Sequence, residues 1–133
     1  MGLLIDASIL IDAERGRVDV GAQIRGREQE EFFISVITAS ELLHGVWRAQ
    51  DRTVRSRRLA FVEGILERFP ILPIDAAVAR THAQLWADLE TRGTMRGAHD
   101  SWLAATCIAR GLILATGDLA AFKKVPGLRV EQW

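Results

Sequence analysis

Four acidic residues stand next to short apolar runs at widely separated points of the sequence. They are Asp6, Glu41, Asp100 and Asp118. Carboxylates in such positions can cap helices, and several together can hold a hard cation such as Mg²⁺ or Mn²⁺. Such an ion can activate water for the hydrolysis of a phosphodiester bond. This chemistry depends on whether the fold brings the four side chains together.

Apolar runs alternate with helical patterns along the 133 residues. The runs predict strands at 2–5, 32–36, 71–74, 112–116 and 128–130. Helices are expected from about 38, 53, 75 and 100, with short helices at 8–16, 18–24 and after 118. Ser8 is positioned to cap the first of them. Strands that are apolar throughout are typical of a parallel sheet covered on both faces. The sequence therefore predicts an α/β fold, a single domain over residues 1–133 with a mostly parallel central sheet flanked by helices on both faces.

Strand ends and helix starts share one edge of such a sheet, and ligands bind at that edge. Asp6 ends the first strand, and Glu41 lies in the first turn of the helix predicted after the second strand. Asp100 starts the helix that leads into the strand 112–116, and Asp118 follows that strand after one glycine. The topology therefore delivers all four carboxylates to the same edge.

Each acid also has a purely structural explanation. Thr38 to Glu41 has the form of a capping box, so Glu41 can be its reciprocal acid. Asp100 and Asp118 can cap helices. Asp75 reaches the same edge and is expected to cap the long helix that follows it. The topology therefore identifies candidate site acids but does not show which of them bind metal.

Electrostatics favours a bound cation if the four acids do meet. Two like charges about 4 Å apart repel by about 4 kcal/mol at an effective dielectric constant near 20. A helix N-terminus recovers only about 0.3–1 kcal/mol. A cluster of acids is therefore tolerable only with bound cations or with protons taken up.

Four motifs resemble those of PIN-domain ribonucleases. The residues are 4–11 (LIDASILI), 34–45 (ISVITASELLHG), 98–106 (AHDSWLAAT) and 114–122 (LATGDLAAF), the last followed by 125–128 (VPGL). Their order and spacing over residues 3–133 are most similar to the VapC toxins of bacterial toxin–antitoxin pairs. The chain departs from the usual pattern at Ala7, where a threonine is common, and at Ala121, where an acid is frequent.

The resemblance implies roles for particular residues. Asp6, Glu41, Asp100 and Asp118 would be the catalytic, metal-binding acids, supported by the hydroxyls of Ser8 and Thr116. It also implies endonucleolytic cleavage of RNA, often tRNA or ribosomal RNA, with Mg²⁺ or Mn²⁺ as cofactor. A homodimer and an inhibitory VapB-type antitoxin are the expected partners.

The charge pattern is compatible with an RNA substrate. The net charge is zero, but 15 of the 17 basic residues are arginine, and residues 44–58 hold five arginines against one acid. A run of this kind is more often a solvated helix face than a docking patch. Arg92 and Arg96, on the loop before Asp100, are candidates for phosphate contacts. If four acids bind metal, the remaining 13 acids and 17 bases leave a charge of +4 outside the site.

Two other functions are compatible with this architecture. A phospho-acceptor signalling domain of the receiver type has similar length, but it needs paired acids after the first strand, and Ala7 follows Asp6. A PIN-like module that binds RNA or protein without cleaving is the second alternative. One cysteine, no apolar run of about 20 residues and no basic leader predict a cytoplasmic protein without membrane association. The resemblance to VapC toxins implies a bacterial one.

Overall fold

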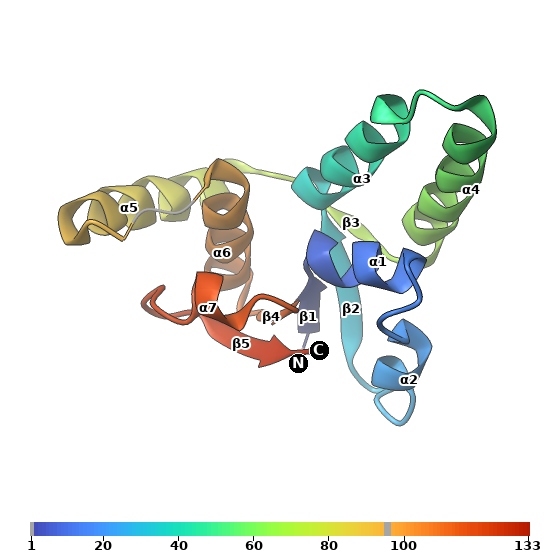
Figure 1. Ribbon diagram of the computed structural model, residues 1–133. Helices are drawn as coiled ribbons and strands as arrows, with labels where there is room; N and C mark the ends of the chain where they lie inside the picture. The colour runs from blue at the N-terminus through green and yellow to red at the C-terminus, as the bar shows by residue number, and fades with distance from the viewer. Residues whose placement is uncertain (1, 95–96) are drawn as a thin grey trace.

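Five parallel strands form the centre of the molecule (Figure 1). The computed structural model describes residues 2–94 and 97–133. The strands are β1 (Gly2–Ile5), β2 (Glu31–Ser35), β3 (Ile71–Leu72), β4 (Ile113–Thr116) and β5 (Arg129–Gln132). They pair in the order β3-β2-β1-β4-β5, and each pair is parallel. The predicted α/β fold with a parallel central sheet is confirmed.

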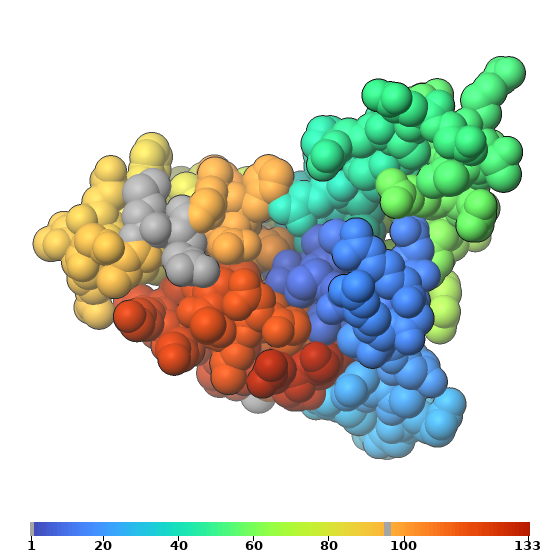
Figure 2. Space-filling model, in the orientation of Figure 1, coloured from blue at the N-terminus to red at the C-terminus, as the bar shows by residue number. Residues whose placement is uncertain are grey.

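Helices cover both faces of this sheet, as expected. They are α1 (Ala7–Glu14), α2 (Val20–Ile24), α3 (Val36–Arg48), α4 (Arg52–Arg68), α5 (Ala76–Arg92), α6 (Ala98–Arg110) and α7 (Leu119–Phe122). The α3–α4 pair and the α5–α6 pair lie on opposite sides in Figure 1, and Figure 2 shows them as two lobes. In the described residues, no helix has the length and apolar character needed to cross a membrane.

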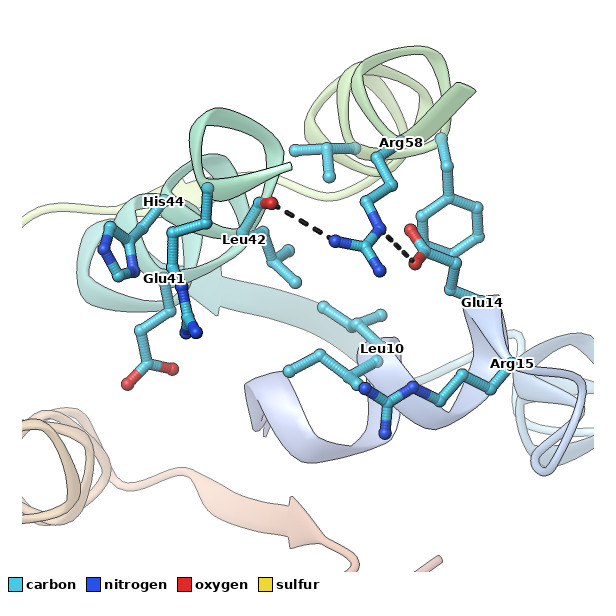
Figure 3. A pocket seen from close by; sticks show the side chains of 12 residues that line it. Leu10, Glu14, Arg15, Glu41, Leu42, His44 and Arg58 are labelled. Atoms are coloured by element: carbon cyan, nitrogen blue, oxygen red, sulfur yellow. Dashed lines mark hydrogen bonds and ion pairs between the residues drawn. The ribbon is translucent and has the colours of Figure 1, made fainter. Parts of the chain in front are cut away.

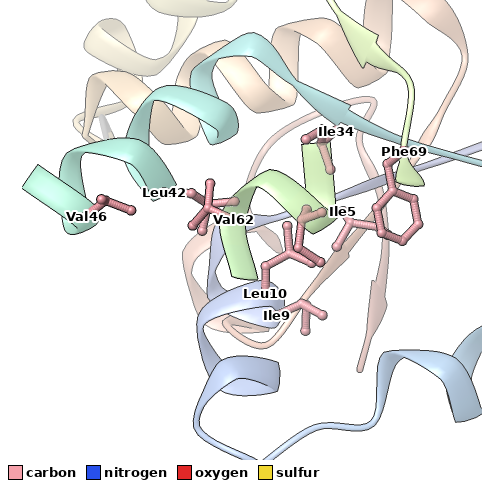
Figure 4. Packing of buried hydrophobic residues seen from close by; sticks show 9 residues of the cluster. Ile5, Ile9, Leu10, Ile34, Leu42, Val46, Val62 and Phe69 are labelled. Carbon is pink, nitrogen blue, oxygen red and sulfur yellow. The ribbon is translucent and has the colours of Figure 1, made fainter. Parts of the chain in front are cut away.

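Successive side chains of β1 point to opposite faces of the sheet, so they pack into two separate core clusters. Ile5 packs with Ile34 against α1, α3 and α4 (Figure 4), whereas Leu4 packs with Leu114 against α6 and α7. All four side chains have no exposed surface. Burying each contributes about 1.5–3 kcal/mol. The apolar strands therefore fix the relative positions of the helices that carry the candidate site.

The strand order places the ends of β1 and β4 side by side. β1 pairs with β2 on one side and with β4 on the other, so the chain crosses over in opposite directions from this point. The backbone N–H of Asp6 continues the ladder and donates to the carbonyl of Ala115 at 2.9 Å. A switch of this kind opens a crevice at the carboxyl ends of the strands.

Several predicted helix starts are wrong by a few residues, and three of them concern residues of the candidate site. Helix α3 begins at Val36 because Ser35 Oγ accepts from the N–H of Ile37 at 3.0 Å, which ends β2 and caps the helix before the capping box is reached. Helix α1 begins at Ala7, so Ser8 lies inside it rather than capping it. Helix α6 begins at Ala98 after Gly97, which places Asp100 within its first turn.

Two polar residues of the α5–α6 pair have structural roles, and the predicted cap at Asp75 is one of them. Asp75 caps α5 by accepting from the N–H of Val78 at 3.0 Å, and it also pairs with Arg110 at 2.9 Å. His82 is a core residue, 8% exposed, whose Nε2 is 3.0 Å from Ser101 Oγ and whose ring stacks on Trp102. Asp75 is thereby accounted for without a catalytic role.

Candidate active site

Asp6 is buried at the end of β1, with 7% of its surface exposed. It occupies the N-cap position of α1, but its carboxylate makes no capping bond within the described residues. Instead, Asp6 Oδ2 accepts hydrogen bonds from Ser8 Oγ at 2.9 Å and from Thr116 Oγ1 at 2.7 Å. Both supporting hydroxyls of the sequence prediction therefore lie against Asp6, and they fix the orientation of its carboxylate.

The same two hydroxyls connect Asp6 to the turn after β4. Thr116 Oγ1 accepts from the N–H of Asp118 at 3.0 Å, and Ser8 Oγ accepts from the N–H of Gly117 at 3.2 Å. The Asp118 carboxylate caps α7, since its Oδ1 accepts from the N–H of Ala121 at 3.2 Å. The backbone of Asp118 is thus part of the site, and one of its carboxylate oxygens has a structural role.

Glu41 lies in the second turn of α3 and not in the first, because that helix begins at Val36. Its side chain reaches across to α6, where Oε1 contacts Nδ1 of His99. Burial raises the pKa of Glu41, the His99 contact lowers it, and repulsion from Asp6 and Asp100 raises it further. Three carboxylates from three separate elements therefore act on one another electrostatically.

Asp100 and His99 come from the first turn of α6. Asp100 is half-buried, and it lies at the helix end where the dipole favours negative charge. The sequence alone did not predict a contact between His99 and Glu41. Its position beside Asp100 was the available signal, but the contact with Glu41 joins residues 58 apart and has no local pattern.

The donor set at this edge fits a hard divalent cation. It consists of carboxylate and hydroxyl oxygens, which Mg²⁺ and Mn²⁺ prefer, without the thiolates that favour zinc. Across residues 2–94 and 97–133, no three His, Cys, Asp or Glu side chains are already gathered as a metal centre. A cation would therefore have to draw the carboxylates together, which also relieves their mutual repulsion.

The remaining candidates lie elsewhere or have other partners. Arg92, the last residue of α5, pairs with Asp88 at 3.1 Å. Arg96 falls outside the described residues. Burial raises the pKa of the Cys107 thiol to about 12, so it is no nucleophile at neutral pH. The possible contacts of Arg92 and Arg96 with phosphate stay predictions.

A groove of about 410 Å³ runs between α1, α3 and α4, with Glu41 at one end (Figure 3). Its apolar lining includes Leu10, Leu42, Phe61 and Val62, and its basic lining comprises His44, Arg15, Arg48 and Arg58. Arg58 is held by Glu14 at 3.6 Å and donates to the carbonyl of Gly45 at 3.4 Å. A molecule seated in this groove would lie beside Glu41.

Comparison with known proteins defines the class to which this fold and site belong. The PIN domain family matches residues 3–128. Ribonuclease VapC1 of Rickettsia felis is 38% identical over 130 residues, which are 98% of this chain and 95% of that protein. The tRNA(fMet)-specific endonuclease VapC of Salmonella typhimurium is 37% identical over 100 residues, 75% of this chain and 74% of that protein.

Solved structures agree with these sequence relatives. DNA-bound VapBC from Salmonella typhimurium contains a chain that superimposes with a TM-score of 0.90 at 28% identity, covering 100% of this chain and 98% of that one. A chain of VapBC2 from Rickettsia felis shares the fold, with a TM-score of 0.91 at 24% identity over 100% and 99% of the two chains. The chain therefore belongs to the PIN-domain family and, within it, to the VapC group.

Proposed function

We propose that this chain is a Mg²⁺- or Mn²⁺-dependent RNA endonuclease that acts in the bacterial cytoplasm as the toxin of a VapBC-type pair. Asp6, Glu41 and Asp100 are its catalytic, metal-binding carboxylates, and Asp118 completes the site. Membership of the PIN-domain family and the names of the VapC ribonuclease relatives support this activity. The receiver-type alternative has no support from either source.

The Asp6 carboxylate is the observation that carries this proposal. It is buried at a sheet edge and held by two hydroxyls, and it adds to the repulsion that raises the pKa of Glu41. A buried carboxylate is costly unless a counter-charge compensates it. In the part of the chain that the structure describes, this side chain does not cap α1, so helix capping does not explain the carboxylate. A cation-binding role accounts for both the burial and the orientation.

Each residue has a defined task in the proposed reaction. The carboxylates of Asp6, Glu41 and Asp100 bind the ion, and Ser8 and Thr116 hold Asp6 in its orientation. A bound ion would lower the pKa of a coordinated water and would stabilise charge on the phosphate oxygens. With attack of water on phosphorus and the 3′-oxygen as the leaving group, which takes up a proton, the products would carry a 5′-phosphate and a 3′-hydroxyl.

The expected substrate is a structured RNA of the tRNA or ribosomal RNA class. The relative from Salmonella typhimurium, named as specific for tRNA(fMet), supports the tRNA class. The basic segment at 44–58 lies on α3 and α4, and Arg48 and Arg58 line the groove that ends at Glu41. RNA phosphates can therefore approach the acids along positively charged surface.

A VapB-type antitoxin is the proposed inhibitor, and the groove is its proposed seat. Its apolar lining suits the apolar face of a short peptide segment, and Arg15 and Arg48 favour an acidic one. Because Glu41 lies at the end of the groove, an occupant also obstructs the catalytic edge (Figure 3). The expected homodimer stays a prediction.

A cleavage assay with a matched pair of variants tests the activity. Total tRNA and ribosomal RNA are incubated with the protein in Mn²⁺, with and without chelator. We expect wild-type cleavage to stop in chelator and Asp100→Asn to lower it by at least 100-fold, while Asp75→Asn, which alters an acid with a structural role at the start of α5, retains it. Undiminished cleavage by Asp100→Asn contradicts the assignment. RNA binding without cleavage in Mn²⁺ would instead identify a non-cleaving PIN-like module.

A further inference from the structure

His99 is the one histidine that the structure brings into contact with a candidate catalytic carboxylate among the described residues. Its Nδ1 faces Glu41 Oε1, and its side chain is 61% exposed at the start of α6. The contact joins α3 to α6 across the edge where Asp6 also lies. Neither the family match nor the names of the relatives assigns a role to this residue.

The chemistry of the two side chains decides which atom carries the proton in the hydrogen bond between His99 and Glu41. An ionised carboxylate can only accept hydrogen bonds, so the Nδ1 atom of His99 must carry the proton that is shared with Glu41. Donation to one carboxylate oxygen fixes the rotation of the whole group. The bond is charge-assisted, because its acceptor is ionised, and such bonds hold geometry better than neutral ones.

The fold does not depend on this contact. Helix α6 is anchored to α5 through His82, Ser101 and Trp102, and to the sheet through the buried side chains of Leu103 and Cys107. A contact that is mostly solvent-exposed adds little to such an anchor, since exposed pairs contribute about 0–1 kcal/mol. Its position, between an acid of α3 and the residue before Asp100, instead points to the site.

We propose that His99 is a positioning residue that holds Glu41 through Nδ1–H···Oε1 and so presents the other carboxylate oxygen to a divalent cation. This inference rests on the proposed function, because it assumes that Glu41 is a ligand. Outer hydrogen-bond partners orient metal ligands in this way, and losing one typically weakens metal affinity or activity by about 10–100-fold. His99 would thus be a fifth residue of the site, in addition to the four acids.

Amide substitutions separate the two ring nitrogens. An asparagine side chain places its N–H₂ near the position of Nδ1, whereas a glutamine side chain places it near Nε2. His99→Asn therefore preserves the donor to Glu41, and His99→Gln removes it while retaining a polar group at the edge. His99→Ala removes both. All three replace an exposed side chain, and thermal unfolding shows whether each variant retains the wild-type fold.

The deciding measurement is Mn²⁺ affinity by titration calorimetry on the protein without RNA. We expect His99→Ala and His99→Gln to bind Mn²⁺ about tenfold more weakly than wild type, and His99→Asn to lie within about threefold of it. Equal affinity in all four proteins overturns the proposal, as does a His99→Asn variant as weak as His99→Ala. Absence of Mn²⁺ binding by the wild type also overturns it.

Measuring RNA cleavage by the same variants tests the positioning role of His99 separately from the proposed endonuclease activity. If the ordering of Mn²⁺ affinities is as expected and kcat follows it at saturating RNA, both proposals are supported. If the ordering holds but the wild type cleaves no RNA in Mn²⁺, the positioning role stands and the assigned activity fails. A variant series in which only KM for RNA changes shows that His99 contacts RNA instead, which contradicts the positioning role.

Discussion

The two hydroxyls that orient Asp6 differ in their surroundings. Thr116 is fully buried and joins Asp6 to the backbone of Asp118, whereas Ser8 is partly exposed and joins it to Gly117. Losing the Thr116 hydroxyl removes a buried donor to Asp6 Oδ2, which keeps its bond from Ser8, and also removes the acceptor of the Asp118 N–H. Thr116 is therefore the more important of the two for the geometry of the site.

Substitution of these hydroxyls tests that difference. We expect Thr116→Val, which keeps the side-chain volume, to lower RNA cleavage by about 10–100-fold. Ser8→Ala should lower it by less, because water can reach Asp6 in place of the lost hydroxyl. The measurement is kcat/KM on one RNA at fixed Mn²⁺. A larger loss for Ser8→Ala than for Thr116→Val would contradict this ranking.

The acidic residues were predictable from the sequence, and their contacts were not. Asp6, Asp100 and Asp118 follow apolar runs or start helices, so their delivery to one edge follows from the alternation of strands and helices. The contact between Glu41 and His99 depends on how α3 and α6 face each other, which no local pattern encodes. The cap at Asp75 was predicted from the sequence, but its pairing with Arg110, 35 residues away, was not.

Helix α3 shows how one capping residue sets the position of a catalytic side chain. The capping box at Thr38 to Glu41 predicted that the helix begins at Thr38. Ser35 lies three residues earlier in the chain, and its hydroxyl oxygen accepts a hydrogen bond from the N–H of Ile37. The helix consequently begins at Val36, and Glu41 is released from any capping role. Sequence rules locate such a start only within a few residues.

The cap itself can be removed without touching the site. Ser35→Ala should lower the free energy of unfolding by about 0.5–2 kcal/mol, because it removes the acceptor for the first turn of α3. Ser40→Ala, an exposed position in the same helix, is the matched control and should change it by less than about 0.5 kcal/mol. Urea unfolding at equilibrium measures both. Equal effects would show that Ser35 does not cap this helix.

The pairing of α5 with α6 contains a buried histidine that couples stability to pH. Burial lowers the pKa of His82 below its ordinary value of about 6.5. Below that pH the unfolded chain binds a proton at His82 that the folded chain does not, so the stability associated with a neutral His82 is present above about pH 6.5 and is lost as the pH falls. The α5–α6 pair should therefore weaken in mild acid.

A comparison of slopes isolates this contribution. The free energy of unfolding of the wild type should fall more steeply between pH 7.5 and 5.5 than that of His82→Gln, although the variant is less stable overall. All other titrating groups are common to the two proteins and cancel in the difference. Urea unfolding at several pH values provides both curves. Parallel curves would show that His82 titrates normally in the folded chain.

The molecule as a whole combines a net charge of zero with a very uneven distribution. Four of its 17 acids are the candidate site residues at the carboxyl edge of the sheet, while five arginines lie between residues 44 and 58 on α3 and α4. Neutrality therefore does not exclude RNA binding, but it predicts a weaker salt dependence than that of a strongly basic protein. The acidic edge should oppose RNA binding whenever no cation occupies it.

Because the acidic edge repels RNA when no cation is bound, removing one catalytic acid should increase the affinity for RNA. In chelator, where no cleavage is expected, Asp100→Asn should bind RNA more tightly than the wild type by a few-fold, because removing one like charge near a phosphate relieves about 1 kcal/mol of repulsion. Glu67→Gln, an exposed acid on α4, is the control for the change in net charge alone. Fluorescence anisotropy with a labelled RNA in chelator measures the three affinities. If Asp100→Asn binds no better than Glu67→Gln in chelator, the RNA does not approach this edge, and the basic surface of α3 and α4 must direct it elsewhere.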